Sequence, residues 1–214
     1  MHSPDGPHST DDAPLAAPLI RAVLFDVGGV LSEDMIDRKL RDLARRYGVE
    51  EQPLLAAGWA LRDGADLGQI SDDEFWRAAL ERVGVTAGPE DHEIESYLVP
   101  VAGTLEIARQ LRARGLLVGI LSNDSREMAR ARRRKHGFDG VFDPILISSE
   151  IGQLKPGPGI YDHALAHLGL AGERCLFVDN REENVEGARR RGMRAIRFTS
   201  AAELQRELQA LGLL

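Results

Sequence analysis

Five short apolar runs lie along this 214-residue chain, and segments with helical periodicity lie between them. Each run is rich in β-forming residues and short enough to be a strand buried on both faces. Strands that alternate with helices favour a parallel sheet with right-handed crossovers and helices on both faces. The sequence therefore predicts an α/β fold built on a Rossmannoid sheet. The expected strands are residues 20–27, 116–122, 144–148, 174–179 and 194–198.

One long stretch interrupts this alternation, because residues 33 to about 97 contain no convincing strand. Ile36, Leu40 and Leu43 recur there at helical spacing, and Ser71 with Glu74 forms a capping-box pattern at the start of another helix. An insert at this point would lie over the carboxyl ends of the strands, where α/β folds bind ligands. We therefore predict a core domain of residues 19–32 and 98–214, with an all-helical cap of residues 33–97.

The composition narrows the functions open to the chain. Lys and Arg number 27 against 34 Asp and Glu, and the net charge of −7 argues against general affinity for nucleic acid or anionic membranes. No apolar stretch is long enough to cross a bilayer. The single cysteine, Cys175, excludes an intrachain disulfide and fits a reducing cytoplasm. Residues 1–18 are polar and rich in Pro, Ser and Asp, so we expect a disordered tail rather than a signal peptide.

Polar side chains follow the predicted strands or lie in the loops beyond them. A parallel sheet brings the carboxyl ends of its strands to one edge, so these groups can converge. Taken singly, each has an ordinary explanation, since Asp and Ser at a strand end are commonly turn or helix-capping residues. Their recurrence at successive strand ends favours a site. The residues are Asp26, Ser122, Asn123, Lys155, Asp179 and Asn180.

The chemistry of these groups is complementary. The carboxylates of Asp26 and Asp179 can hold a hard cation such as Mg²⁺, and a carboxylate can also attack phosphorus to form an acyl phosphate. A hydroxyl and backbone amides, as at Ser122 and Asn123, can hold phosphoryl oxygens. Lys155 can neutralise the charge that gathers on those oxygens. Together they indicate phosphoryl-transfer chemistry.

Four stretches resemble the motifs of a known family. They read "FDVGGVL", "ILSN", "GQLKPGPGIYDHAL" and "LFVDNREENVEGARRRGM", and they look like motifs one to four of the haloacid dehalogenase (HAD) superfamily. The resemblance covers residues from about 20 to about 200. The insert after the first motif resembles the helical cap of the subfamily that carries one there. The resemblance implies a hydrolase.

The resemblance also implies a role for each matching residue. Asp26 resembles the nucleophile, and Asp179 resembles the acidic ligand of Mg²⁺. Ser122 and Asn123 resemble the pair that binds phosphate, and Lys155 resembles the charge-neutralising lysine.

The residues around these positions complete the expected site. The backbone carbonyl of Gly28 would also reach the metal. Gly29 allows the backbone to turn sharply and approach the phosphate closely. Asn180 and Asn184 belong to the fourth motif, and we expect them beside the residues that hold the metal.

The chain departs from the family's pattern at two positions. Phosphatases of the family usually carry a second Asp two residues after the nucleophile, which protonates the leaving alcohol and then activates water. Gly28 stands there and can do neither, although such help is worth about 10²–10⁴ in rate. The fourth motif often reads Asp-Asp, whereas Asn180 brings no charge. Glu33 or Asp34 could supply a proton from the hinge of the cap, but we interpret both as solvated loop acids.

Three functions are compatible with these departures. Our prediction is a cytoplasmic Mg²⁺-dependent phosphatase, a monomer or homodimer, which acts on a small phosphorylated metabolite with an easy leaving group, such as a sugar 1-phosphate or an acyl phosphate. A 2-haloacid dehalogenase needs neither metal nor acid and tolerates Gly28, although those enzymes usually have an aromatic residue there. A scaffold without turnover, with a binding or regulatory role, is the third.

Other residues favour ordinary structural roles. Trp59 and Trp76 fall in the insert, where we expect core packing, with a substrate-facing role open for one of them. His163 and His167 are four residues apart on a predicted helix, as in a zinc pair, but there is no obvious third ligand.

Overall fold

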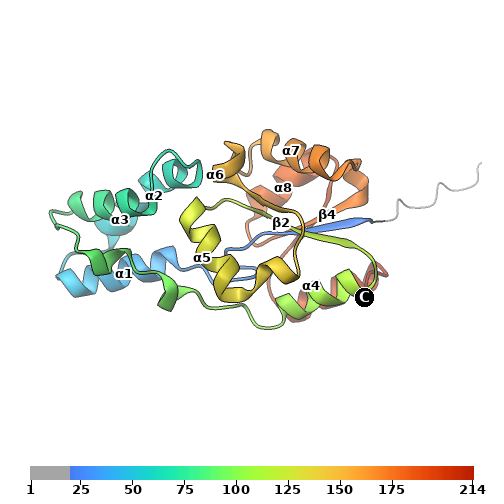
Figure 1. Ribbon diagram of the computed structural model, residues 1–214, viewed down its shortest axis with the longest axis horizontal. Coiled ribbons are helices and arrows are strands. Elements are labelled where there is room, and N and C mark those ends of the chain that lie inside the picture. The colour runs from blue at the N-terminus through green and yellow to red at the C-terminus, as the bar shows by residue number, and fades with distance from the viewer. Residues whose placement is uncertain (1–19) are drawn as a thin grey trace, which may run out of the picture.

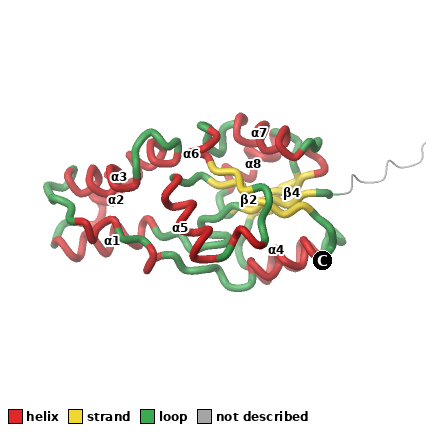
Figure 2. The backbone as a smooth tube through the Cα atoms, in the orientation of Figure 1, coloured by secondary structure: helices red, strands yellow, loops and turns green. Residues whose placement is uncertain are grey.

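The computed structural model describes residues 20–214, and the predicted tail at residues 1–18 lies outside them. The five predicted strands are confirmed, and they form one parallel sheet (Figure 2). The sheet order is β3-β2-β1-β4-β5, so the first strand lies at the centre with β2 and β4 as its neighbours. The strands are β1 (Ala22–Phe25), β2 (Leu117–Ser122), β3 (Ile145–Ile147), β4 (Cys175–Asp179) and β5 (Arg194–Arg197).

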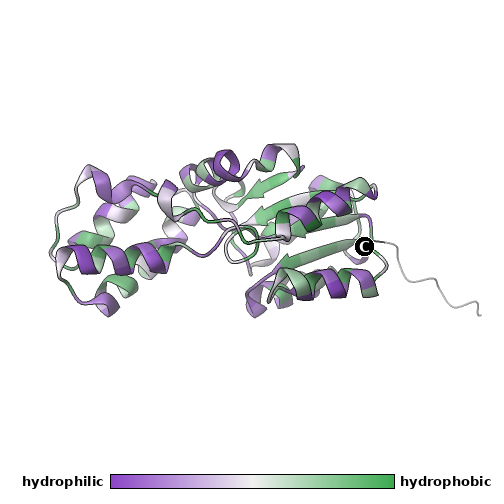
Figure 3. Ribbon diagram, turned by 90° about the horizontal axis from the view of Figure 1, so that it is seen from below, coloured by the Kyte–Doolittle hydropathy of each residue, from purple (hydrophilic) through white to green (hydrophobic). Residues whose placement is uncertain are grey.

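Helices cover both faces of this sheet (Figure 1). Alternate side chains of β1 point to opposite faces of the sheet, so Val23 and Phe25 belong to one apolar cluster and Ala22 and Leu24 to the other. The central strands therefore read as continuous apolar runs, and they are green in Figure 3. On the face of Val23 and Phe25 lie α4 (Thr104–Ala113), α5 (Arg126–His136) and α9 (Ala201–Ala210). On the face of Ala22 and Leu24 lie α7 (Pro158–Leu168) and α8 (Glu182–Arg190). The short helix α6 (Ser148–Ile151) follows β3.

Residues 33–97, which we call the helical region, extend to one side of the sheet (Figure 1). All of them are described, and they contain helices and 3₁₀ turns but no strand. Their apolar side chains form a separate cluster around Leu40, Leu54 and Trp76, to which Met128 and Ala131 of α5 also belong. The elements are α1 (Ile36–Tyr47), α2 (Glu51–Asp66), α3 (Asp72–Glu81) and the 3₁₀ turns η1 (Pro89–His92) and η2 (Glu95–Tyr97).

Local sequence explains where these helices begin and end. The predicted capping box is present at α3, where the Ser71 hydroxyl accepts from the Glu74 amide and the Glu74 carboxylate accepts from the Ser71 amide. α1 ends at Gly48, whose φ of 65° suits a residue without a Cβ atom. Across residues 20–214, no helix combines the length and apolar composition that crossing a bilayer requires.

The chain enters and leaves the helical region side by side. The Glu33 amide donates to the Val99 carbonyl at 2.8 Å, and the Val101 amide donates to the Leu31 carbonyl at 3.1 Å. These antiparallel contacts form a two-stranded hinge next to the end of β1. The hinge fixes the residues between β1 and α1 close to the strand ends.

Candidate active site

The sheet topology brings two carboxylates together at its centre. β1 and β4 pair in parallel with Phe25 opposite Val178, so Asp26 and Asp179 follow at the same level of neighbouring strands. The Asp26 amide donates to the Val178 carbonyl at 2.8 Å and extends the pairing by one residue. Both side chains are buried. The expectation that strand ends converge on one edge therefore holds for this pair.

Lys155 joins the two carboxylates. Its Nζ lies 2.7 Å from Asp26 Oδ1 and 2.7 Å from Asp179 Oδ2, and it donates to the Leu121 carbonyl at 3.0 Å. Burial lowers the pKa of Lys155, but Asp179 and Asp26 outweigh it, so the pKa is raised above its ordinary value. Burial raises the pKa of Asp179 to about 6, while Lys155 acts to lower it. The lysine is thus a fixed positive charge between two acids.

Two asparagines hold Asp26, Lys155 and Asp179, which we call the triad, in place. The Asn123 side chain donates to the Lys155 carbonyl at 2.9 Å and accepts from the Lys155 amide at 2.9 Å, so it fixes the backbone of the loop. Asn184 Nδ2 donates to Asp179 Oδ2 at 3.0 Å. The Asn184 carbonyl in turn accepts from the Tyr161 hydroxyl at 2.8 Å. Both asparagines therefore position the charged groups, and both line the cavity described below.

Helix α8 approaches the loop of Lys155 closely because Gly187 has no side chain. A Cβ atom at Gly187 would lie 2.8 Å from the Tyr161 hydroxyl oxygen and 2.9 Å from the Pro156 carbonyl oxygen. Any larger residue would push the loop and the helix apart. The glycine of the fourth motif thus serves the geometry of Lys155.

The other residues predicted to bind phosphate differ in exposure. Ser122 is 1% exposed, and its hydroxyl has no hydrogen-bond partner among the described residues. Gly29 has a φ of 76°, and a Cβ atom there would collide with the Asn180 side chain. Gly28 and Asn123 line the cavity, whereas the buried Ser122 and the partly exposed Gly29 are not among its lining residues.

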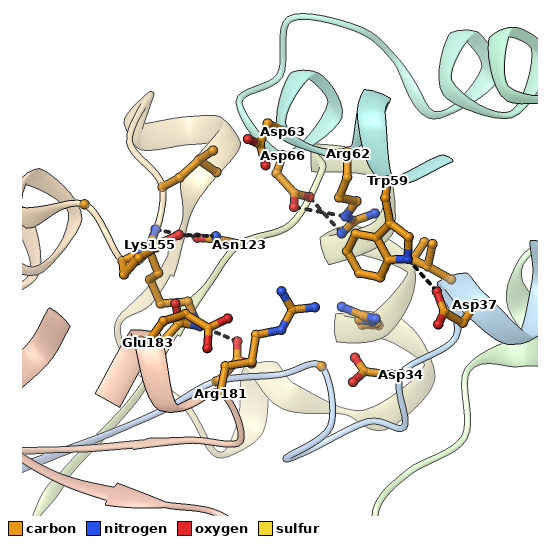
Figure 4. A pocket seen from close by; sticks show the side chains of 18 residues that line it. Asp34, Asp37, Trp59, Arg62, Asp63, Asp66, Asn123, Lys155, Arg181 and Glu183 are labelled. Carbon is orange, nitrogen blue, oxygen red and sulfur yellow. Dashed lines mark hydrogen bonds and ion pairs between the residues drawn. The ribbon is translucent and has the colours of Figure 1, made fainter. Parts of the chain in front are cut away.

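A cavity of 680 Å³ opens above the triad, between the sheet edge and the helical region (Figure 4). Trp59 of α2 forms part of its wall and is 41% exposed, whereas Trp76 is 1% exposed and packs in the helical region. The Trp59 indole donates to Asp37 Oδ1 at 2.8 Å, and the Arg181 guanidinium lies 5.3 Å from the ring centroid. Trp59 is therefore the tryptophan that faces the cavity.

A buried chain of charges links the helical region to the core beside this cavity. Arg62 of α2 contacts Asp66 at 2.7 Å and Asp124 at 3.5 Å, and Asp124 contacts Arg132 of α5 at 2.7 Å. Sequence reasoning missed these residues and Arg181. The spacing of Arg62 and Asp66, four residues apart on one helix, was the signal available.

The two hinge acids occupy different surroundings. Glu33 accepts from Arg38 at 2.9 Å, and both side chains are exposed, so the interpretation as a solvated acid holds for it. Asp34 instead lines the cavity, and its Oδ2 accepts from Asn180 Nδ2 at 3.4 Å. Desolvation in the cavity, and then the charge of Asp26, raises the pKa of Asp34. Asp34 is exposed, as the interpretation of a solvated acid expects, and it lines the cavity in addition.

The donor set fits a hard divalent cation. Within residues 20–214, no group of three or more His, Cys, Asp or Glu side chains is placed to hold a metal ion, and this includes His163 and His167. Mg²⁺ needs no such group, because it binds through one or two carboxylates and keeps several waters. Lys155 Nζ occupies the point where Asp26 Oδ1 and Asp179 Oδ2 converge, so the other oxygens of these two carboxylates would serve a cation. Of these, Asp179 Oδ1 also accepts from the Arg181 amide at 2.8 Å. The residues present therefore suit Mg²⁺.

Known proteins resemble this chain in sequence and in fold. A phosphatase of Mycobacterium tuberculosis is 31% identical over 221 aligned residues, which cover 90% of this chain and 95% of that protein. (S)-2-haloacid dehalogenase 4A of Burkholderia cepacia is 27% identical, with 84% and 83% covered. A crystal structure of a HAD family enzyme from Bacteroides thetaiotaomicron, in complex with magnesium and inorganic phosphate, superposes with a TM-score of 0.68 at 19% identity, with 85% and 95% covered.

A family model described as haloacid dehalogenase-like hydrolase matches residues 20–192. That match spans strands β1 to β4, the helical region and the loop of Lys155. The chain belongs to the haloacid dehalogenase-like hydrolases.

Proposed function

We propose that this protein is a Mg²⁺-dependent phosphatase of a small phosphorylated metabolite. The observation that carries the proposal is the contact of Lys155 Nζ with both Asp26 and Asp179, each at 2.7 Å, beneath a cavity. A nucleophilic carboxylate, a second carboxylate and a fixed cation are what phosphoryl transfer requires at one point.

The chain's own residues would divide the reaction among them. Asp26 attacks phosphorus and forms the aspartyl phosphate, which water then hydrolyses. Lys155 neutralises the charge on the phosphoryl oxygens, and Asn123 keeps its backbone in place. The Ser122 hydroxyl has no hydrogen-bond partner among the described residues, and it would donate to a phosphoryl oxygen. Gly29 lets the backbone turn beside it. Asn184 orients Asp179.

Mg²⁺ would be held by Asp26, Asp179 and the Gly28 carbonyl, with Asn180 beside them. When bound, it supplies positive charge that stabilises the transferring phosphoryl group. The magnesium and phosphate in the Bacteroides enzyme support this proposal.

The helical region would act as the cap that closes over the substrate. It contributes Trp59 and Arg62 to the cavity wall, while the core contributes Asp26 and Lys155. A substrate bound between the two would be shielded from water, which strengthens the electrostatic interactions in the site. The cavity is the size of a small-metabolite site. We retain residues 33–97 as the cap boundary, and a cytoplasmic monomer or homodimer, as predictions.

A dehalogenase is the second candidate, and it tolerates Gly28, although those enzymes usually have an aromatic residue at that position. Displacement of halide by Asp26 needs no proton donor, and the chain has a relative named (S)-2-haloacid dehalogenase. Lys155 beside the nucleophile fits either reaction.

The test is phosphate release from a panel that includes p-nitrophenyl phosphate, sugar 1-phosphates and acyl phosphates, with Mg²⁺ and with EDTA. Metal-dependent release is expected, fastest for the best leaving groups. Halide release from 2-chloropropionate, measured on the same preparation, separates the second candidate. Mg²⁺ binding without either product would instead indicate a scaffold without turnover.

A further inference from the structure

The space that a side chain at Gly28 would need is already occupied. A Cβ atom built on Gly28 would lie 2.8 Å from Asp34 Oδ1. Real Cβ atoms essentially never approach another atom so closely, so a side chain at position 28 would require the Asp34 carboxyl to move. The carboxyl of Asp34 therefore lies directly beside the place that a side chain at position 28 would take.

The hinge holds Asp34 in this position. On one side, the Glu33 backbone pairs with Val99 at 2.8 Å. On the other, Met35 is fully buried, and its carbonyl accepts from the Lys39 amide in the first turn of α1. Asn180 donates to Asp34 Oδ2 from the strand end of β4. Asp34 is thus anchored through its backbone on both sides and through its side chain.

Asp34 is distinguished from the other acids of the cavity by its contact with position 28. Asp63 of α2 and Glu183 of α8 also line the cavity, but neither is among the atoms that a Cβ atom at Gly28 would meet. Asp37 accepts from the Trp59 indole, and Asp66 is paired with Arg62. Glu33 is paired with Arg38 outside the cavity. No hydrogen bond or ion pair within residues 20–214 joins Asp34 to Asp26 or Asp179, and its carboxyl is accessible from the cavity. Of the two hinge acids, Asp34 is the one that a substrate can reach.

We propose that Asp34, supplied by the hinge, is the catalytic acid and base of this hydrolase, in place of a carboxylate at position 28. This rests on the proposed phosphatase function. As Asp26 forms its bond to phosphorus, the bond from phosphorus to the leaving oxygen breaks, and Asp34 gives that oxygen a proton. A water then attacks phosphorus and gives its proton to Asp34. The bond to Asp26 breaks, and inorganic phosphate leaves.

Asp34→Asn tests the proposal, with Glu33→Gln as the matched control. Turnover of sugar or alkyl phosphates should fall about 10²–10⁴-fold in Asp34→Asn and stay unchanged in Glu33→Gln. With p-nitrophenyl phosphate, Asp34→Asn should release one equivalent of p-nitrophenol in a burst and then turn over slowly, because the first step needs no acid but the second needs the base. A purely structural role would not create this burst.

Moving the carboxyl from position 34 to position 28 tests the proposal even if a variant of Asp34 alone loses its fold. Gly28→Asp alone should lower activity, because its side chain meets Asp34. Gly28→Asp combined with Asp34→Ala should recover most of the activity that Asp34→Ala loses. Wild-type turnover in Asp34→Asn, or no recovery in the folded double variant, would overturn the role of Asp34 while leaving the phosphatase intact. No phosphate release by the wild type would overturn both.

Discussion

Two buried lysines, one in each part of the molecule, have opposite surroundings. Lys155 lies between two carboxylates at the sheet edge, and its pKa is raised. Lys39 lies in the helical region with its Nζ 4.4 Å from the centroid of the Trp76 ring, and it donates to the Glu93 carbonyl. Desolvation lowers the pKa of Lys39 to about 8. Burial alone therefore does not mark a functional lysine, whereas two opposing charges do.

The contrast extends to the two regions as a whole. The site in the core concentrates charges that compensate one another, which is costly to assemble and useful for a charged transition state. Around Lys39 the helical region has aromatic rings and a carbonyl, which suit the packing of a long side chain. The remaining lysine, Lys135, is exposed on α5 and serves as a reference for both. We expect variants in the two regions to separate chemistry from packing.

The largest effect should follow from Asp26→Asn. The amide is not a nucleophile towards phosphorus, so turnover should be abolished. The side chain keeps its size, so the far-ultraviolet circular dichroism and the cooperative unfolding should remain. The exposed Asp139→Asn is a control in the same region and should retain full activity. Phosphate release that persists in Asp26→Asn would mean that another group is the nucleophile.

Lys155→Met should come next, because it removes the charge but keeps the length of the side chain. Two buried carboxylates would then face each other without a cation. Loss of one partner of such a cluster costs about 3–5 kcal/mol in the free energy of unfolding, and turnover should fall about 10²–10³-fold. Lys135→Met should change neither quantity. Urea unfolding and phosphate release on both variants check this, and equal stability of the two would contradict the role of the triad.

The core half of the site could be predicted because topology fixes it. Asp26 and Lys155 are 129 residues apart, yet they meet because the strand ends of a parallel sheet share one edge. Hydrophobic run length located the strands, and polar residues at three of the strand ends, with Lys155 in the loop beyond a fourth, located the site. Coordinates were needed for Arg132 and Arg181, and to show that Ser122 and Gly29 do not line the cavity. The sequence does not tell which residues near a strand end line a cavity.

The helical half could not be predicted, for a physical reason. Helical periodicity identifies the apolar face of α2 but not what its other face meets, so Trp59 and Arg62 could not be assigned to the cavity. Asp34 and Glu33 are adjacent acids in one hinge, and only the backbone geometry separates the acid in the cavity from the acid outside. Side chains that meet across two regions leave no periodic signal in either.

Trp59→Ala asks whether the helical region takes part in binding. The ring lies in the cavity wall, so its loss should raise KM by roughly two- to tenfold, the equivalent of about 0.5–1.5 kcal/mol for an aromatic contact. The value of kcat should change little. Trp59→Phe keeps a ring but loses the bond to Asp37, and it should bind substrate nearly as well as the wild type. A fall in kcat at constant KM would instead place Trp59 in the transition state.

The smallest effect should come from Lys39→Met, and it should depend on pH. The pKa of Lys39 is about 8 in the folded protein against an ordinary value of 10.5, so between these values the unfolded chain binds more protons. The free energy of unfolding of the wild type should therefore rise as pH increases from about 8 towards 10.5, relative to the variant. At pH 7 the lysine is charged in both states, and replacing it with an apolar side chain should be neutral or mildly stabilising.

Urea unfolding at neutral and alkaline pH measures the difference, with Lys135→Met as the control that should follow the wild type. If the free energies of unfolding of the wild type and Lys39→Met change with pH by the same amount, Lys39 does not lose its proton inside the helical region. Lys39 and Lys155 would then differ in their neighbouring groups but not in their charge.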